Sequence, residues 1–193
     1  MRGWAFVVLL CASAAVASAQ VGEFSISGGV SHFGSASLGD SAGSAVDLHD
    51  GFHLGLRFTL NTHKFFGHEF GYGYSHTNIQ IHTDPVQDNP TSIQQGFYDF
   101  LVYATPEGSR IRPFGAAGAN FTSFYPPGAS AYNGGGQTKF GFNVGAGIKV
   151  KISERFNTRL DVRDYNTGKP FNFDNASGRL NQLQVSVGFG LLF

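Results

Sequence analysis

Apolar and polar residues alternate one by one along most of this chain, and this two-residue period constrains the fold more than any other feature. The clearest segment runs from Gly51 to Asn61, where every even-numbered position is Phe or Leu and the odd-numbered positions include His53, Gly55, Arg57 and Thr59. Successive side chains of a β-strand point to opposite faces, so this segment predicts a strand with one apolar and one polar face. The 3.6-residue period of an amphipathic helix does not show anywhere, and we therefore expect an all-β protein.

Eight segments fit this strand pattern, at 22–33, 51–61, 65–82, 93–105, 111–125, 138–151, 155–165 and 180–193. The connections between them alternate in length: 34–50, 83–92, 126–137 and 166–179 are long, whereas 62–64, 106–110 and 152–154 are short. Antiparallel membrane barrels have short turns at one end and longer loops at the other. The pattern therefore predicts an eight-stranded, up-and-down transmembrane β-barrel, with both termini at the short-turn end.

Composition indicates which face of these strands meets lipid. Only 13% of the residues are charged, about half the share usual in soluble domains, and 20 are Phe. The interior of an eight-stranded barrel is just wide enough for side chains or one small ligand, so the bulky aromatic face fits poorly inside. We expect this face to point outward. A soluble, lipocalin-like barrel with its apolar face inward is the alternative fold.

The polar face combines small residues with charges of both signs. If it faces the lumen, its charged residues form a paired network, because an unpaired buried charge is costly. The alternative role for these side chains is gating of a narrow ion path. The residues concerned are Arg57, Glu69, Asp99, Arg159, Asp161 and Arg163.

The first nineteen residues have the pattern of a secretory signal peptide. Arg2 precedes an apolar stretch at 4–16, and Ala17-Ser18-Ala19 offers small residues for cleavage before Gln20. We expect a signal peptide at 1–19 and an outer-membrane barrel at 20–193. Lipidation at Cys11 is the weaker alternative, because Leu10 stands where a small residue is needed. The rest of the chain lacks an apolar run long enough for a transmembrane helix.

The final strand carries the most specific local signal. Its alternation, which runs up to an aromatic final residue, resembles the C-terminal β-signal that the barrel-assembly machinery reads in bacterial outer-membrane proteins; the residues are Val185, Val187, Phe189, Leu191 and Phe193. The segments at 112–118 and 159–165 resemble two strands of the OmpA-like β-barrel family. OmpA itself has a periplasmic domain after its barrel, whereas this sequence is closer in plan to small, OmpX-like barrels that consist of the barrel alone. The resemblance implies a bacterial outer-membrane location, contact with outer-membrane lipid, and the assembly machinery and periplasmic chaperones as partners during biogenesis.

The residues themselves suggest no catalytic, cofactor or metal site. Ser75 and His76 invite comparison with barrel enzymes that modify lipid A, but neighbours in a strand point to opposite faces. His49 with His53, or His76 with His82, are the histidine pairs closest to a metal site, and neither has zinc-type spacing. With 13 basic and 13 acidic residues, the chain also lacks the basic surface that nucleic-acid binding requires.

The leading functional hypothesis is therefore a structural or surface-interaction barrel without catalytic activity, which acts through its long loops. The alternatives are a narrow channel for small solutes or ions and a lipid A-modifying enzyme. Two aromatic residues in the last long loop, Phe171 and Phe173, either form a contact patch or fold back onto the barrel rim.

Overall fold

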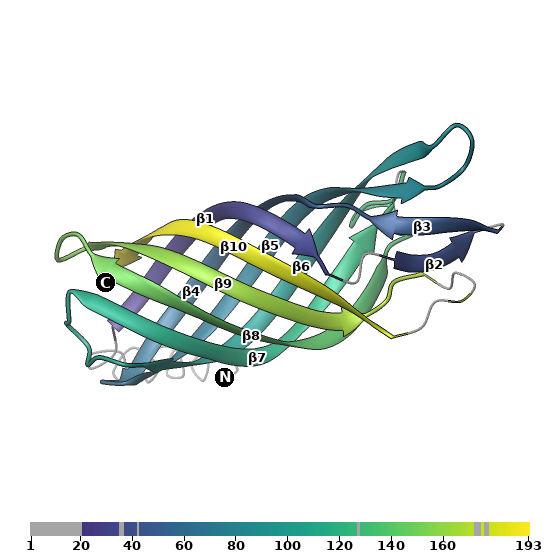
Figure 1. Cartoon of the computed structure of the whole chain (residues 1–193). Coiled ribbons are helices and arrows are strands. Elements are labelled where there is room, and N and C mark those ends of the chain that lie inside the picture. Colours follow the sequence, from purple (N-terminus) through teal and green to yellow (C-terminus); the bar gives the residue numbers. More distant parts are fainter. Residues whose placement is uncertain (1–20, 35–36, 42, 127, 172–174, 176–177) are drawn as a thin grey trace, which may run out of the picture.

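Eight long strands form a closed antiparallel β-barrel in the computed structural model (Figure 1), which describes residues 21–34, 37–41, 43–126, 128–171, 175 and 178–193. The predicted signal peptide lies outside these residues. No helix in the described part of the chain is long and apolar enough to cross a membrane. The barrel strands are β1 (Val21–Phe33), β4 (Gly51–His63), β5 (Phe66–Ile81), β6 (Gln87–Tyr103), β7 (Ile111–Tyr125), β8 (Gln137–Lys151), β9 (Phe156–Gly168) and β10 (Arg179–Leu192).

Pairing of the first strand with the last closes the barrel. β1 runs antiparallel to β10 from Glu23 opposite Leu192 to Phe33 opposite Gln182, and it pairs with β4 on its other edge. The sheet continues from β4 through β5, β6, β7, β8 and β9 to β10. The eight-stranded, up-and-down fold predicted from the sequence is therefore confirmed, and no open edge runs along the barrel wall.

The two ends of the barrel differ, as the connection lengths predicted. Gly22 and Phe193 exchange backbone hydrogen bonds of 2.9 Å at one end, which we call the terminal end; the three short turns lie there. The other end, which we call the loop end, carries the longer connections (Figure 1).

Two of the predicted long loops contain more strand than expected. The connection at 34–50 holds a hairpin of β2 (Ser37–Ser41) and β3 (Ser44–Leu48), and β3 pairs with β5 from Val46 opposite Ile81 to Leu48 opposite Ile79. This is the edge of β5 that β4 leaves unpaired beyond His76.

The predicted loop at 83–92 is also wrong in part, because β6 begins at Gln87. Residues 87–91 pair with β5 alone, whereas pairing with β7 starts at Ser92. Pro90 lies in this stretch; proline cannot donate to a ladder, but an edge position tolerates it. The β5–β6 ribbon therefore extends beyond the barrel rim, as Figure 1 shows.

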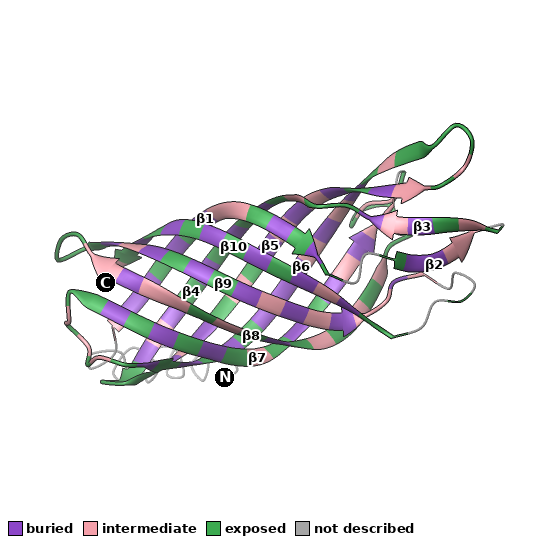
Figure 2. Ribbon diagram, viewed as in Figure 1, coloured by how far each residue is buried: buried purple, intermediate pink, exposed green. Residues whose placement is uncertain are grey.

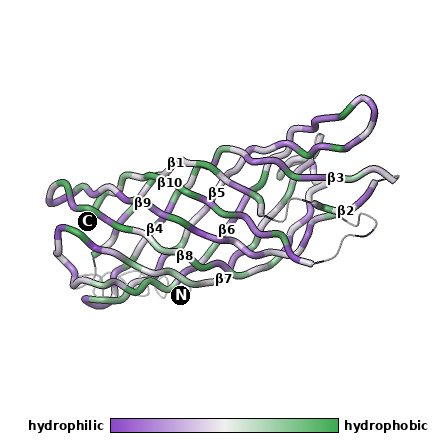
Figure 3. Tube along the Cα trace, in the orientation of Figure 1, coloured by the Kyte–Doolittle hydropathy of each residue, from purple (hydrophilic) through white to green (hydrophobic). Residues whose placement is uncertain are grey.

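Burial alternates along the barrel strands (Figure 2), and hydropathy varies along the same strands (Figure 3). The exposed positions include most of the large apolar residues. On β4, Phe52, Leu54, Leu56 and Phe58 are exposed, whereas Arg57 and Thr59 are buried. The prediction that the aromatic face points outward is thus confirmed, and the lipocalin-like alternative is wrong.

At some positions glycine makes room for a large side chain in the interior. Gly71 of β5 lies beneath the ring of Phe97 on β6, where an added Cβ atom would overlap the ring carbons. A few aromatic residues therefore do point into the lumen, although most point outward.

Candidate functional site

The six charged residues singled out from the sequence meet in the middle of the lumen. None of them is more than 2% exposed. Glu69 of β5 lies at the centre, where its carboxylate accepts hydrogen bonds from Arg159 Nη1 at 2.8 Å and from Arg163 Nη2 at 2.7 Å. Thr59 of the neighbouring strand donates a third, at 2.8 Å. The network therefore spans the barrel from β4 and β5 to β9.

Asp161 and Asp99 complete this network. Asp161 accepts from Arg159 Nε at 2.6 Å and lies 3.1 Å from Arg57 Nη1, while Asp99 pairs with Arg163. Three guanidinium groups thus face three carboxylates, and the charges cancel within the layer. Such an arrangement offsets the cost of burying each ion.

A second buried ion pair was not predicted. Lys149 Nζ of β8 donates to Glu23 Oε2 of β1 at 2.7 Å, and Arg159 Nη1 lies 3.8 Å from Glu23 Oε1. Strand alternation places Glu23 on the same face as Ser25, so the inward direction of this carboxylate could have been found. That Lys149 is its partner could not have been found from the sequence, because the two residues are 126 positions apart.

Between the charged layer and the loop end, the lumen contains buried, hydrogen-bonded polar side chains. His53 Nδ1 lies 3.2 Å from Ser75 Oγ, and Gln182 bridges to Ser31 and Gln95. Ser75 therefore contacts His53 rather than His76, which lies on the outer face beside the ring of Phe52. The Ser75–His53 contact is enclosed, since both residues are at most 2% exposed.

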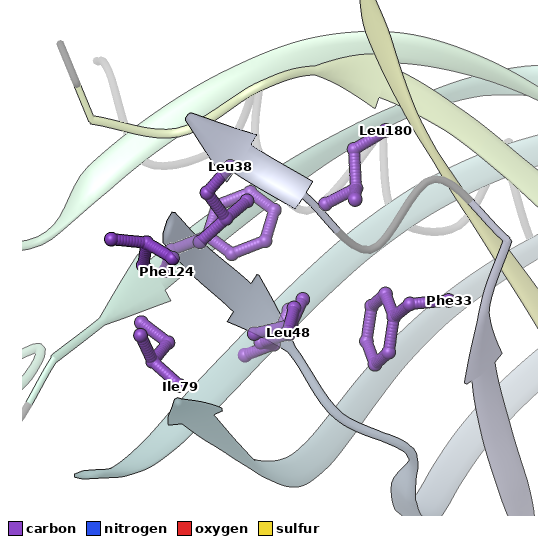
Figure 4. Packing of buried hydrophobic residues seen from close by; sticks show 8 residues of the cluster. Phe33, Leu38, Leu48, Ile79, Phe124 and Leu180 are labelled. Atoms are coloured by element: carbon purple, nitrogen blue, oxygen red, sulfur yellow. The ribbon is translucent and has the colours of Figure 1, made fainter. Parts of the chain in front are cut away.

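An apolar cluster, which we call the mouth cluster, closes the loop end of the lumen (Figure 4). Five of its members come from the barrel strands and three from the β2–β3 hairpin, whose buried side chains pack against them. The hairpin is held by backbone hydrogen bonds from His49 to Asn78 and from His82 to Ala45, both 2.9 Å, and by a side-chain hydrogen bond between His82 Nε2 and Asp47 Oδ2, also 2.9 Å. The mouth cluster consists of Phe33, Leu38, Val46, Leu48, Ile79, Ile93, Phe124 and Leu180.

Phe171, one of the two loop aromatics, packs against the mouth cluster, so it folds back onto the rim rather than forming a separate patch. Phe173 lies outside the described residues. The proposed histidine pairs do not form: His53 points into the lumen, His49 contacts Gln80, and His82 contacts Asp47. Among the residues that the structure describes, no group of three or more His, Cys, Asp and Glu side chains could hold a metal ion.

The terminal end contains an open cavity of about 320 Å³. Arg112 lies on its wall, bonded to Glu107 at 2.6 Å and positioned 3.7 Å from the centre of the Tyr103 ring. Lys149 and Glu23 form part of the wall toward the lumen. This cavity is a vestibule that stops at the buried ion pairs.

The outer face carries two belts of aromatic residues. Near the terminal end, Phe66 stacks on Phe100 and Phe193 stacks on Phe58, with ring centres 5.6 and 6.2 Å apart. Near the loop end, Phe52 contacts Tyr74 and His76. Membrane barrels have such girdles at both interfaces, with an apolar band between them.

The residues of the predicted assembly signal lie on the lipid side of β10. Val185, Val187, Phe189, Leu191 and Phe193 are all exposed there, and β10 is the strand that closes the barrel against β1. Their recognition by the assembly machinery stays a prediction.

Comparison with known proteins agrees with this geometry. Residues 4–193 match the family described as outer membrane protein beta-barrel domain. The solved structure of OprG from Pseudomonas aeruginosa has 18% identity and a TM-score of 0.64, over 89% of this chain and 96% of that chain. Neisserial surface protein A has 12% identity and a TM-score of 0.62, over 91% of this chain and 98% of that chain. Ail of Yersinia pestis, solved with the heparin analogue sucrose octasulfate, has 14% identity and a TM-score of 0.51, over 89% of this chain and 99% of that chain.

These solved structures share the fold of the chain at low sequence identity. A comparison with curated proteins finds no match. The family match covers nearly the whole sequence and agrees with the closed barrel, the outward aromatic face and the two girdles. The chain therefore belongs to the outer-membrane β-barrel protein family.

Proposed function

We propose that this protein is a closed structural barrel of the bacterial outer membrane, which acts through the surface of its loop end. In this proposal both termini face the periplasm and the loop end faces the cell exterior. The lumen does not conduct, and the barrel carries out no catalysis. The observation that supports a closed barrel is the buried ion network around Glu69.

Two layers block the lumen in this proposal. None of the six side chains of the charged layer is more than 2% exposed, so water barely reaches them. The mouth cluster adds an apolar layer above it, which an ion would cross only at a high desolvation cost. Both layers would have to rearrange before an ion could pass.

The loop end instead offers an extended surface. The β2–β3 hairpin and the β5–β6 ribbon project beyond the barrel, and the β7–β8 connection holds Tyr132 fully exposed. Loops on a rigid scaffold commonly carry binding functions. The enclosed Ser75–His53 contact, by comparison, gives a substrate no access.

Conductance across a planar bilayer tests the closed lumen. We expect purified, reconstituted protein to show no discrete current steps in concentrated KCl, with insertion verified by the boiling-dependent shift of its band on an SDS gel. An open porin inserted into the same bilayer serves as the positive control. Reproducible current steps from the unmodified protein would overturn the closed barrel in favour of a narrow channel.

A further inference from the structure

The basic residues of the loop end gather at one corner of the barrel. Within the described chain, the Lys and Arg residues of this end are Lys139 at the start of β8, Lys169 after β9 and Arg179 at the start of β10. Among the acidic residues of the loop end that the structure describes, Asp47 lies on the β2–β3 hairpin, Asp50 directly before β4, and Asp84 and Asp88 on the β5–β6 ribbon. Asp40 of β2 accepts a hydrogen bond from Asn175 of the β9–β10 connection. We call the group of Lys139, Lys169 and Arg179 the basic corner.

Strand pairing brings these three cations together around a residue without a side chain. Arg179 pairs with Gly168 of β9, and Lys169 follows Gly168 directly. On the other side, a Cβ atom added at Gly168 would lie 3.7 Å from Lys139 Cδ. The corner therefore gathers three positive charges where β8 begins, β9 ends and β10 begins. Arg179 is exposed there, whereas Lys139 lies opposite Thr122, whose side chain is buried.

The guanidinium group of Arg179 is held in one orientation. Its Nε donates to the side-chain oxygen of Asn166, its Nη2 donates to the backbone oxygen of Asn166 at 3.1 Å, and its Cζ lies 5.1 Å from the centre of the Phe142 ring. Asn166 in turn donates to the side chain of Asn181. Nη1 donates to no residue in the described chain, so the guanidinium can still bind an anion. Arginine binds phosphate well because its donors form a planar fork.

The outer face changes from apolar to polar at this corner. Val144 and Leu183 are exposed apolar residues on either side of Asp164, and the Asn166–Asn181 pair and Arg179 follow toward the rim. On the adjacent β8, Phe142 and Phe140 stay exposed at this height. Interfacial aromatics mark the level of lipid headgroups, so the basic corner sits directly above a surface that suits acyl chains.

We propose that the basic corner binds the phosphate group of an outer-leaflet lipid, whose acyl chain lies against Phe142, Val144 and Leu183. Arg179 receives the phosphate, and Lys139 and Lys169 add charge around it. The Asp164 carboxylate repels a phosphate placed deeper in the membrane, and this sets the depth of the headgroup. The assignment to the outer leaflet rests on the proposed outward direction of the loop end.

The test uses the full-length mature protein in dodecyl maltoside micelles, which contain neither charge nor phosphate. Three probes are titrated: dioctanoyl phosphatidic acid, dioctanoylglycerol with the same chains but no phosphate, and inorganic phosphate. The arginine Nε–Hε signals in NMR spectra report binding, and the signal of Arg179 is assigned from the Arg179→Gln variant. We expect saturable binding of phosphatidic acid, at least about tenfold tighter than either other probe, because the headgroup and the chains bind together.

Variants distinguish lipid binding at the basic corner from non-specific attraction of the lipid to positive charge. Arg179→Gln should weaken phosphatidic acid binding about tenfold, as measured by native mass spectrometry, and Arg179→Lys should give an intermediate loss because it keeps the charge without the fork. Lys64→Gln, the same change of charge in the turn at the terminal end, should leave binding unchanged. The boiling-dependent gel shift of each variant shows that the barrel is folded.

Three results would overturn the proposal. Equal binding of inorganic phosphate would show an anion site without a lipid, and equal binding of dioctanoylglycerol would show an apolar groove only. Phosphatidic acid binding that is indifferent to Arg179→Gln would place the lipid elsewhere. Binding in micelles depends on neither orientation nor conductance, so failure here and failure of the proposed function can be told apart.

Discussion

Each charged side chain of the lumen depends on several others. Arg163 contacts Glu69, Asp161 and Asp99 together, so its removal leaves three buried carboxylates with fewer partners. The free-energy cost of such a loss comes mainly from the charges that remain, not from the contacts that disappear.

We therefore expect Arg163→Ala to lower the free energy of unfolding by about 3–5 kcal/mol. The measurement is the urea concentration at which the boiling-sensitive band disappears from SDS gels. Arg155→Ala, in an exposed turn at the terminal end, is the matched control and should change this midpoint little. Equal midpoints for the two variants would mean that the network adds nothing to stability.

On the lipid face, introducing a charge should destabilise the barrel, just as removing one does in the lumen. Leu56 lies in the middle of β4 on the outer face, and Leu56→Arg should cost about 2–4 kcal/mol, because the guanidinium enters the apolar band. Val86→Arg changes a residue of similar exposure in the connection between β5 and β6 and should be nearly neutral. Urea titration in lipid vesicles compares the two, and a silent Leu56→Arg would place the membrane elsewhere.

At the scale of elements, β10 combines two roles. It closes the barrel against β1, and its outer face has the pattern of the assembly signal. The ring of Phe193 stacks on Phe58, with centres 6.2 Å apart, and the Phe193 backbone pairs with Gly22. These contacts are few, so their loss should affect the stability of the finished barrel only modestly.

Deletion of Phe193 should therefore reduce the amount of folded protein in the outer membrane much more than it reduces refolding into micelles in vitro. Phe140→Ala, which removes an exposed aromatic at the opposite end, is the control and should assemble normally. Both quantities are measured from the boiling-sensitive band. If assembly in cells is normal without Phe193, the terminal aromatic is not part of a signal.

The two short strands β2 and β3 depend on contacts with distant parts of the chain more than on their own pairing. The β2–β3 hairpin is short, but Leu38, Val46 and Leu48 are buried in the mouth cluster and β3 gains a ladder with β5. An isolated two-stranded hairpin is marginally stable in water. The segment therefore becomes a strand pair only because the barrel mouth supplies its partners.

At the scale of the whole molecule, the two ends should face different compartments. The only cysteine of the chain, Cys11, lies in the predicted signal peptide, so single cysteines can be introduced into the mature protein. Tyr132→Cys at the loop end should react with a membrane-impermeant maleimide on intact cells, because Tyr132 is fully exposed in its connection.

Ser109→Cys, in the turn before β7, should react only after the cells are broken. Mass spectrometry of the purified protein measures labelling of both variants. The reverse pattern would invert the proposed orientation and assign the basic corner to the inner leaflet.

The sequence alone determined the barrel class, seven of the strands to within about three residues at each end, and the two faces of the strands that alternate clearly. These properties follow from the two-residue period of extended backbone, which is local and can be read from neighbouring positions. The inward direction of Arg57, Glu69, Asp99, Arg159, Asp161 and Arg163 was predictable for this reason.

Only the tertiary structure decided which inward residues meet. Glu23 with Lys149, Arg163 with Glu69 and Ser75 with His53 come from different strands, and the first two pairs are 126 and 94 positions apart in the chain. Closure of a barrel with a fixed stagger sets which residues share a height, and no local pattern encodes that stagger. The mouth cluster depends on closure in the same way, because it collects residues from β1, β5, β6, β7 and β10 as well as the β2–β3 hairpin. The basic corner depends on it less, because β8, β9 and β10 are consecutive strands.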